Sequence, residues 1–226
     1  MQFTYYGQSC FNINFKTYNL LFDPFISKNE LAKEIDIDKI EADYILISHG
    51  HFDHIDDAVS IAKRTGAKVI CNFEVGSWLE KQGVENIHQM NTGGKWKFEF
   101  GTVKCVNAIH SSSMPDGTYG GSAIGFILSS DEKNIYYAGD TALTMDMQLI
   151  AMQYSIDLCI LPVGDNFTMG YEDAVEAAKM VKTKKAIGVH FDTFGFIKID
   201  HQKVKSYFSE NNIDLTLPKI GETIEI

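Results

Sequence analysis

The sequence predicts an α/β protein with a helix–sheet–sheet–helix sandwich. Three observations predict it: strands alternate with helices in both halves of the chain, the centre is rich in strands, and no linker, low-complexity segment or repeat interrupts the order. A simple doubly wound sheet fits this order less well. The chain has 226 residues, a length that favours one large domain, so a single domain over 1–226 is expected.

The first half opens with short β-rich runs and continues with alternating strands and helices. ADYILIS at 42–48 is a nearly continuous apolar run, typical of a strand buried on both faces. A helix is expected over 56–66, capped by Asp56 or Asp57 and ended by Gly66. The other expected elements are strands over 3–7, 10–15, 19–25 and 67–72, a helical or loop excursion over 29–41, and a helix over 74–83.

The second half begins with four β-rich runs and returns to alternation. YEDAVEAAKMVKTKK at 171–185 has the apolar spacing of an amphipathic helix. The expected strands are 95–100, 102–110, 123–130, 134–140, 157–164 and 186–192, with further strands within 215–226; helices are expected over 141–153, 171–185 and 200–212.

Composition excludes several classes of function. The formal net charge is −10 and no basic stripe is present, so nucleic acid is not an expected partner. The first residues lack a basic region followed by an apolar one, and no run approaches eighteen apolar residues, so neither a signal peptide nor a membrane span is expected. Four widely spaced cysteines without a CxxC pair indicate reduced thiols and a cytoplasmic location, with a pair of disulfides as the alternative.

The stretch ISHGHFDHIDD at 47–57 carries the densest group of ligand-type side chains. His49, His51, Asp53 and His54 form the pattern H-x-H-x-D-H. Residues two apart at an extended strand end point to the same side, so His49 and His51 can meet one cation. Asp53 and His54 can reach a second position once the chain turns, and Gly50 would let the backbone bend tightly.

Three further ligand-type residues directly follow apolar runs. His110 ends TVKCVNAIH, Asp140 ends NIYYAGD, and His190 lies in AIGVHFD. A lone histidine after a strand is more often structural, but three matching strand ends beside the dense loop favour a metal site. Imidazole and carboxylate ligands suit zinc, iron or manganese rather than calcium, which takes oxygen ligands only.

With these residues the sequence resembles the metallo-β-lactamase fold superfamily. It is most similar to the bacterial metal-dependent hydrolases of unassigned substrate, of the UPF0173 kind, which are related to ascorbate-phosphate lactonases. The resemblance runs almost the full length and rests on YYGQSCFNI, DPF, HGHFDHIDD, AKRTGAKVI, NTGG, HSSS, GDT, PVGDNFTMG and HFDTF.

The resemblance implies a four-layer αββα sandwich and a dinuclear metal site. By analogy His49, His51 and His110 hold the first metal, Asp53, His54 and His190 hold the second, and Asp140 bridges them. The zinc β-lactamases commonly have a cysteine where this chain has Asp140, which favours the hydrolase branch. The chain departs from the family at Gln8, where a histidine is common, and at Phe52, where a small residue is common.

The chemistry expected of two such metals is hydrolysis. Two cations can share a water, lower its pKa and provide a bridging hydroxide that attacks an ester, lactone or phosphodiester of a small molecule. Asp53 is the catalytic candidate, because its carboxylate can orient that hydroxide. Zinc is the first expectation for both divalent ions, with Mn, Fe and Ni as alternatives. Substrate contacts are expected from Asn166, Phe167, Thr168 and Thr193, against a plain loop-packing role.

Supporting roles and alternatives stay open on sequence alone. Asp23, Ser48, Asp57 and Thr141 are candidates to orient the ligands. The Gly-rich stretch HSSSMPDGTYGGSA at 110–123 is either a mobile loop or a plain connection. The alternative functions are a non-catalytic metal-binding or sensing protein and a di-iron redox protein on the same fold. A homo-oligomer is an open alternative to a monomer.

Overall fold

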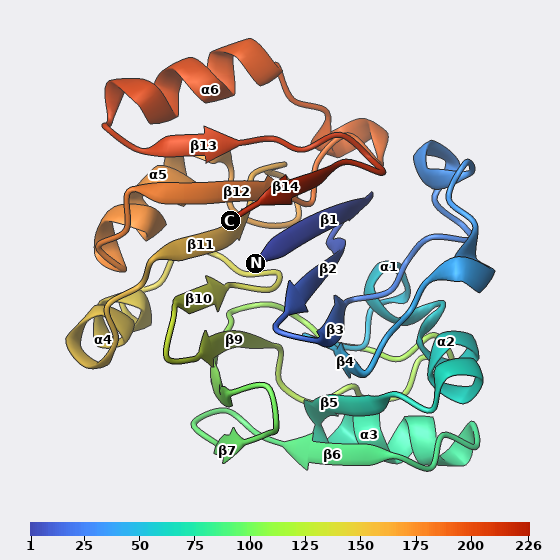
Figure 1. The fold of residues 1–226 in the computed structure, drawn as a ribbon. Coiled ribbons are helices and arrows are strands. Elements are labelled where there is room, and N and C mark those ends of the chain that lie inside the picture. Colours follow the sequence, from blue (N-terminus) through green and yellow to red (C-terminus); the bar gives the residue numbers. More distant parts are fainter. The chain divides into compact units, whose positions relative to one another are not determined.

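The computed structural model describes residues 1–226, and the chain forms two compact units. The first unit comprises Met1–Thr92, Ser111–Ala123 and Lys219–Ile226, and the second comprises Gly93–His110 and Ile124–Pro218. Each unit contains one mixed, seven-stranded sheet with its own helices (Figure 1). The two units are described in turn.

The sheet of the first unit changes from antiparallel to parallel pairing at its strand β3 (Tyr18–Phe22). Its strands, in spatial order, are β14 (Thr223–Glu225), β1 (Gln2–Gly7), β2 (Cys10–Phe15), β3 (Tyr18–Phe22), β4 (Tyr44–Leu46), β5 (Lys68–Asn72) and β6 (Ile87–Met90). β14, β1, β2 and β3 pair antiparallel, and β3 to β6 pair in parallel. The helical segments are η1 (Glu30–Ala32), η2 (Ile37–Lys39), α1 (Phe52–Ile55), α2 (Ala58–Thr65) and α3 (Phe73–Lys81).

The second unit brings the carboxyl ends of five strands to one edge of its sheet. In spatial order its strands are β13 (Asp214–Thr216), β12 (Lys185–Val189), β11 (Leu158–Pro162), β10 (Asn134–Tyr137), β9 (Ile124–Ser129), β8 (Thr102–Asn107) and β7 (Lys95–Lys97). β10 to β13 are parallel, and β8 runs the same way because it lies antiparallel to β9, which lies antiparallel to β10. The carboxyl ends of β8, β10, β11, β12 and β13 therefore share one edge. The helices are α4 (Asp146–Gln153), α5 (Tyr171–Met180), η3 (Gly195–Ile197) and α6 (His201–Glu210).

Buried apolar residues of the first unit form one continuous core. Ala58, Ile61 and Ala62 of α2 are buried in it, as the apolar stripe predicts, and Gly66 ends the helix with φ +72°. A left-handed residue of this kind is easiest for glycine. The caps differ from expectation: neither predicted aspartate caps α2 with its side chain. The Asp57 carboxylate instead accepts from the backbone N–H groups of Ile26 and Ser27, 2.6 and 3.0 Å away.

Several element boundaries differ from the sequence prediction. The strand β6 was not predicted, because IHQM has no apolar alternation. The helix expected over 141–153 begins at Asp146, and the helix expected over 171–185 ends at Met180. Lys182 two residues later has φ +59°, a conformation that cannot continue a helix.

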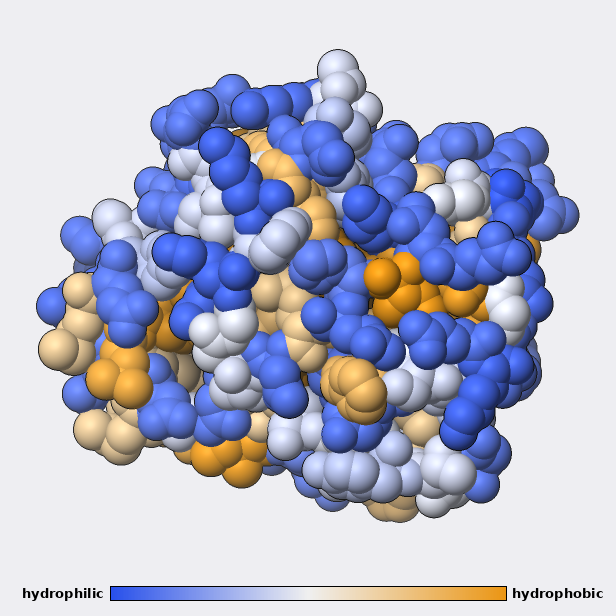
Figure 2. Space-filling view, turned by 90° about the horizontal axis from the view of Figure 1, so that it is seen from below, coloured by the Kyte–Doolittle hydropathy of each residue, from blue (hydrophilic) through white to orange (hydrophobic).

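No helix of the structure is long and apolar enough to cross a membrane. Figure 2 shows one face of the molecule, on which hydrophilic residues predominate and hydrophobic ones form small groups. The four cysteines form no disulfide. Burial raises the pKa of the Cys10 and Cys159 thiols, and raises the pKa of Cys105 to about 12, so these thiols stay protonated at neutral pH.

Candidate metal centre

The motif loop of the first unit begins where β4 leaves the sheet. β4 ends at Leu46, and α1 is a single turn that starts at Phe52. His49 and His51 precede this turn, whereas Asp53 and His54 lie within it. His51 stands at the N-cap position but its side chain makes no cap hydrogen bond. His49 and His54 are fully buried and Asp53 is 8% exposed, whereas His51 is partly buried.

One buried carboxylate orients two of the histidines. Asp23 accepts from Ser48 N–H at 2.7 Å and Ser48 O–H at 2.6 Å, and His54 Nδ1 lies 2.9 Å from it. An ionised carboxylate only accepts, so the Ser48 hydrogen is directed at Asp23 and His54 carries its hydrogen on Nδ1. The Ser48 oxygen, 2.9 Å from His49 Nδ1, then accepts from His49. Both rings therefore carry their lone pair on Nε2.

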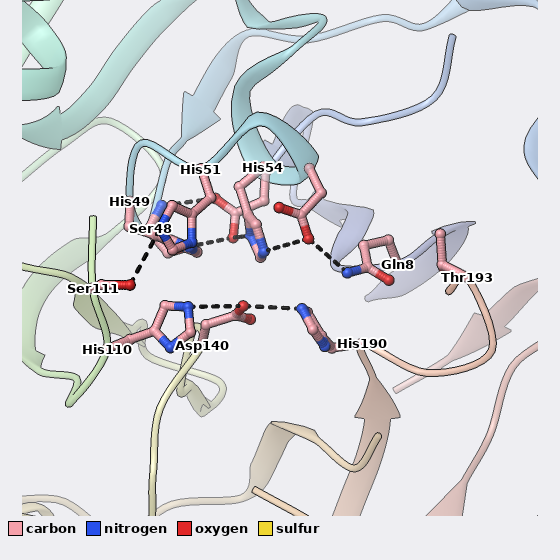
Figure 3. A network of polar contacts seen from close by, with 12 residues as sticks. Gln8, Ser48, His49, His51, His54, His110, Ser111, Asp140, His190 and Thr193 are labelled. Carbon is pink, nitrogen blue, oxygen red and sulfur yellow. Dashed lines mark hydrogen bonds and ion pairs between the residues drawn. The ribbon is translucent and has the colours of Figure 1, made fainter. Parts of the chain in front are cut away.

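The distances between these nitrogen atoms and their neighbours show whether the residues fit a metal ion. His49 Nε2 lies 3.0 Å from His51 Nδ1, and two nitrogen ligands of one tetrahedral zinc ion lie about 3.3 Å apart. His54 Nε2 lies 3.5 Å from Asp53 Oδ2. When His54 carries its hydrogen on Nδ1, His54 Nε2 and Asp53 Oδ2 are both acceptors. A cation stabilises this arrangement. The donor set of the first unit fits a metal, and Figure 3 shows its contacts.

Gln8 holds the carboxylate of Asp53 by a hydrogen bond. Its amide Nε2 donates to Asp53 Oδ2 over 2.8 Å, and Gln8 is fully buried. Gln8 lies in the β1–β2 turn with φ +54°, a conformation uncommon for a residue other than glycine. The Tyr5 hydroxyl donates to the Gln8 carbonyl at 2.9 Å and fixes this turn. A neutral amide thus positions the Asp53 carboxylate.

The Gly-rich stretch after His110 is a fixed connection in the first unit. Asn72 Nδ2 donates to the carbonyls of Gly120 and Ser122, 2.7 and 3.0 Å away. Gly50 N–H donates to Ser112 Oγ at 3.1 Å, which joins this stretch to the motif loop. The alternative of a mobile loop is not supported by these contacts.

Gly50 is required for space rather than for bending. Its φ is not positive, but a Cβ at this position would overlap the Met114 sulfur and approach the Ser113 carbonyl.

Sequence reasoning missed Asn72 and Ser112 as residues that support the motif loop and the Gly-rich stretch. It also missed Ser111, whose hydroxyl lies 3.3 Å from His51 Nε2. The only signal for them was polar residues directly after a strand or a candidate ligand.

In the second unit Asp140 lies between two histidines. Its Oδ2 is 3.0 Å from His190 Nε2 and 3.6 Å from His110 Nε2 (Figure 3). The three residues follow β10, β12 and β8, whose carboxyl ends share an edge, so the sheet itself brings them together. Thr141 Oγ1 accepts from Ile109 N–H at 3.0 Å and ties the Asp140 segment to the His110 segment. His190 has φ +56°, which turns the chain sharply after β12.

The candidate substrate residues lie on the loops that follow β11 and β12 of this same sheet. Asn166 has φ +53°, and Phe167 beside it is 49% exposed. The hydroxyls of Thr168 and Thr193 donate to the carbonyls of Met169 and Phe191, at 3.3 and 3.4 Å. These loops lie at the edge that carries His190, and substrate contact by the four residues stays a prediction.

Comparison with known proteins identifies the family. The family model described as a beta-lactamase superfamily domain matches residues 18–191. A UPF0173 metal-dependent hydrolase of Christiangramia forsetii is 52% identical over 227 residues, covering all of both chains. The chain belongs to the UPF0173 metal-dependent hydrolases of the metallo-β-lactamase superfamily. A UPF0173 hydrolase of Methylacidiphilum infernorum is 50% identical and covers 99% of each chain.

The solved structure of a metallo hydrolase has the same fold. Igni18, a metallo hydrolase of the archaeon Ignicoccus hospitalis, is 32% identical with a TM-score of 0.89, covering 99% of this chain and 97% of its own. The predicted metallo-β-lactamase fold, with two mixed seven-stranded sheets flanked by helices, is confirmed. The prediction that the chain is a metal-dependent hydrolase is confirmed at the level of the family.

Proposed function

We propose that this hydrolase cleaves an ester, lactone or phosphodiester bond of a small molecule at a centre of two divalent metal ions. His49, His51 and His110 would hold one ion, and Asp53, His54 and His190 the other. Asp140 would bridge them. The observation that carries the proposal is the orientation of His49 and His54 by Asp23, which directs both Nε2 lone pairs away from the supporting hydrogen bonds.

The bound ions would supply an activated water and a Lewis acid for the electrophile. The chain's own residues supply position. Asp53 would orient the attacking water with the carboxylate that Gln8 holds at 2.8 Å. Asp140, fixed between two imidazoles, would keep the ions at one spacing. Zinc is the proposed metal, with Mn, Fe and Ni as the alternatives, because mixed imidazole and carboxylate sites accept several ions.

The remaining features of the proposal concern the setting of the reaction. The thiols that form no disulfide suit a cytoplasmic protein, and the net charge of −10 disfavours nucleic acid as substrate. We therefore propose a small-molecule substrate, contacted by Asn166, Phe167, Thr168 and Thr193.

Metal content and turnover measured together test the proposal. The protein is purified without added metal, bound metals are quantified per chain, and phosphodiester, lactone and thioester substrates are screened before and after chelation. The expected result is about two ions per chain, with turnover that chelation abolishes and zinc or manganese restores. His51→Ala should lose both, whereas His88→Ala on β6, outside the motif loop, should lose neither.

The other outcomes point to other functions. Two ions with no turnover on any ester would favour a sensing protein, and reversible iron redox chemistry would favour a di-iron protein. Less than one ion per chain after soaking in zinc or manganese would contradict the dinuclear centre.

A further inference from the structure

Two phenylalanines of the second unit are exposed and in contact with each other. Phe167 is 49% exposed and Phe196 is 79% exposed. Their rings meet edge to face with centroids 6.4 Å apart, a favourable geometry for an aromatic pair. Phe167 lies in the loop after β11 and Phe196 in η3 after β12, so two separate segments build one apolar surface.

The loop that carries Phe167 is fixed to both neighbouring ligand segments. Met169 N–H donates to the Thr141 carbonyl at 3.0 Å, next to Asp140. At the other end Gly164 lies so close to the His190 carbonyl that a Cβ would overlap it. Asp165 and Asn166 have φ of +62° and +53°. Asp and Asn adopt such angles more readily than other non-glycine residues, and here they turn the chain before Phe167.

The segment that carries Phe196 is equally well fixed. Asp192 N–H donates to the Ile197 carbonyl at 2.8 Å, which closes the loop around Phe196. The Asp192 carboxylate accepts from Ile199 N–H at 3.0 Å and lies 2.6 Å from His201 Nε2. Phe196 therefore stands on a rigid turn only six residues from His190.

A single exposed apolar side chain needs no explanation. Met152 on α4 is 78% exposed and is such a case. The phenylalanine pair differs because the loop of Phe167 is hydrogen-bonded to Thr141 beside Asp140, and the loop of Phe196 directly continues from His190. Neither segment, 164–170 or 190–197, contains a lysine or arginine. The exposed Lys198 directly follows the second segment, so the feature that distinguishes this surface is the apolar pair itself.

We propose that Phe167 and Phe196 bind an apolar group of the substrate beside the bond that is cleaved. The substrate class is then an ester, lactone or phosphodiester that carries an aromatic or branched aliphatic group. This inference rests on the proposed hydrolase function and adds the chemistry of the group that is recognised. Phe196 is a specificity residue that the sequence did not reveal.

Two diesters with the same leaving group test the inference. Phenyl p-nitrophenyl phosphate and methyl p-nitrophenyl phosphate are compared with the zinc-loaded wild type and with Phe196→Ala, Phe167→Ala and Phe196→Leu. In the alanine variants kcat/KM for the phenyl diester should fall about tenfold, and that for the methyl diester by less than about twofold. Phe196→Leu should keep much of the phenyl preference, and Met152→Ala, equally exposed, should keep all of it.

A binding measurement separates failure of this inference from failure of the proposed function. Phenylphosphonate and methylphosphonate are titrated calorimetrically into the same proteins. Tighter binding of the phenyl compound, lost in Phe196→Ala, supports the inference even when no diester is hydrolysed. Equal binding of the two compounds, or equal loss of both diesters, overturns it while leaving hydrolysis in place. A change of oligomeric state in Phe196→Ala with the phenyl preference intact overturns it in favour of an interface between copies.

Discussion

The two units hold their ligand-type residues by different means. In the first unit four such residues fall within the six positions from His49 to His54, and hydrogen bonds from Asp23, Ser48 and Gln8 set their orientation. In the second unit His110, Asp140 and His190 are far apart in sequence, and the shared edge of one sheet brings them together. Side-chain hydrogen bonds should therefore matter most in the first unit, and backbone topology in the second.

The largest effect is expected from Asp140, the one carboxylate that the second unit contributes to the proposed metal centre. Asp140→Asn keeps the size of the side chain but removes the charge between the two histidines. Turnover should fall by at least about 100-fold, and metal content should fall below that of the wild type, as measured by elemental analysis. Asp146→Asn, on the exposed start of α4 in the same unit, is the matched control and should leave both unchanged. Full metal content with full turnover in Asp140→Asn would remove this residue from the centre.

The second prediction sharpens the comparison in the first unit. Asp23→Asn leaves its size but disturbs the acceptor shared by Ser48 and His54, so metal affinity should fall about 10–100-fold. Asp57→Asn is the control, because Asp57 is also buried and also accepts backbone N–H groups but contacts no motif histidine in these hydrogen bonds. Both variants should lower the melting temperature. Equal losses of metal affinity in the two would show that Asp23 acts only through stability.

A smaller effect is expected at Gln8. Gln8→Ala removes the amide donor to Asp53, and kcat should fall about tenfold with KM nearly unchanged, because Asp53 is positioned less well while the substrate loops are untouched. Gln8→His should restore a donor and recover much of the loss. An alanine variant with wild-type kcat would mean that Asp53 keeps its position without help.

The same comparison explains which parts of the site were predictable from sequence. The H-x-H-x-D-H loop was visible because its ligands are close in sequence, and the three strand ends were visible because each ligand-type residue follows an apolar run. Asp23 and Ser48 were named as candidates, but their shared hydrogen bonds depend on the register of β3 and β4. Thr141 was also named, and it supports the backbone before His110 rather than a ligand ring.

Other features required the tertiary structure. Asn72 and Ser112 act on the Gly-rich stretch and on Gly50 across dozens of residues, so no local pattern reveals them. The apolar contact of Phe167 with Phe196 likewise depends on two loops that meet only because β11 and β12 are neighbours. For Asp57 the local pattern predicts a contact that the structure does not have. Its position before a helix predicts a side-chain cap, whereas its carboxylate accepts from the backbone N–H of Ile26.

The smallest effect should come from loss of the contact between His201 and Asp192 in the loop after His190. His201→Ala removes the contact with Asp192, a pair in which the side chains are 49% and 30% exposed. A partly exposed contact of this kind contributes about 0–1 kcal/mol, so the melting temperature should fall by no more than about 4 °C. Metal affinity should change less than about threefold, because β12 and the sheet edge, rather than this side chain, place His190. A loss of metal affinity as large as that of Asp23→Asn would show that the second unit also depends on side-chain support, and the contrast between the units would no longer hold.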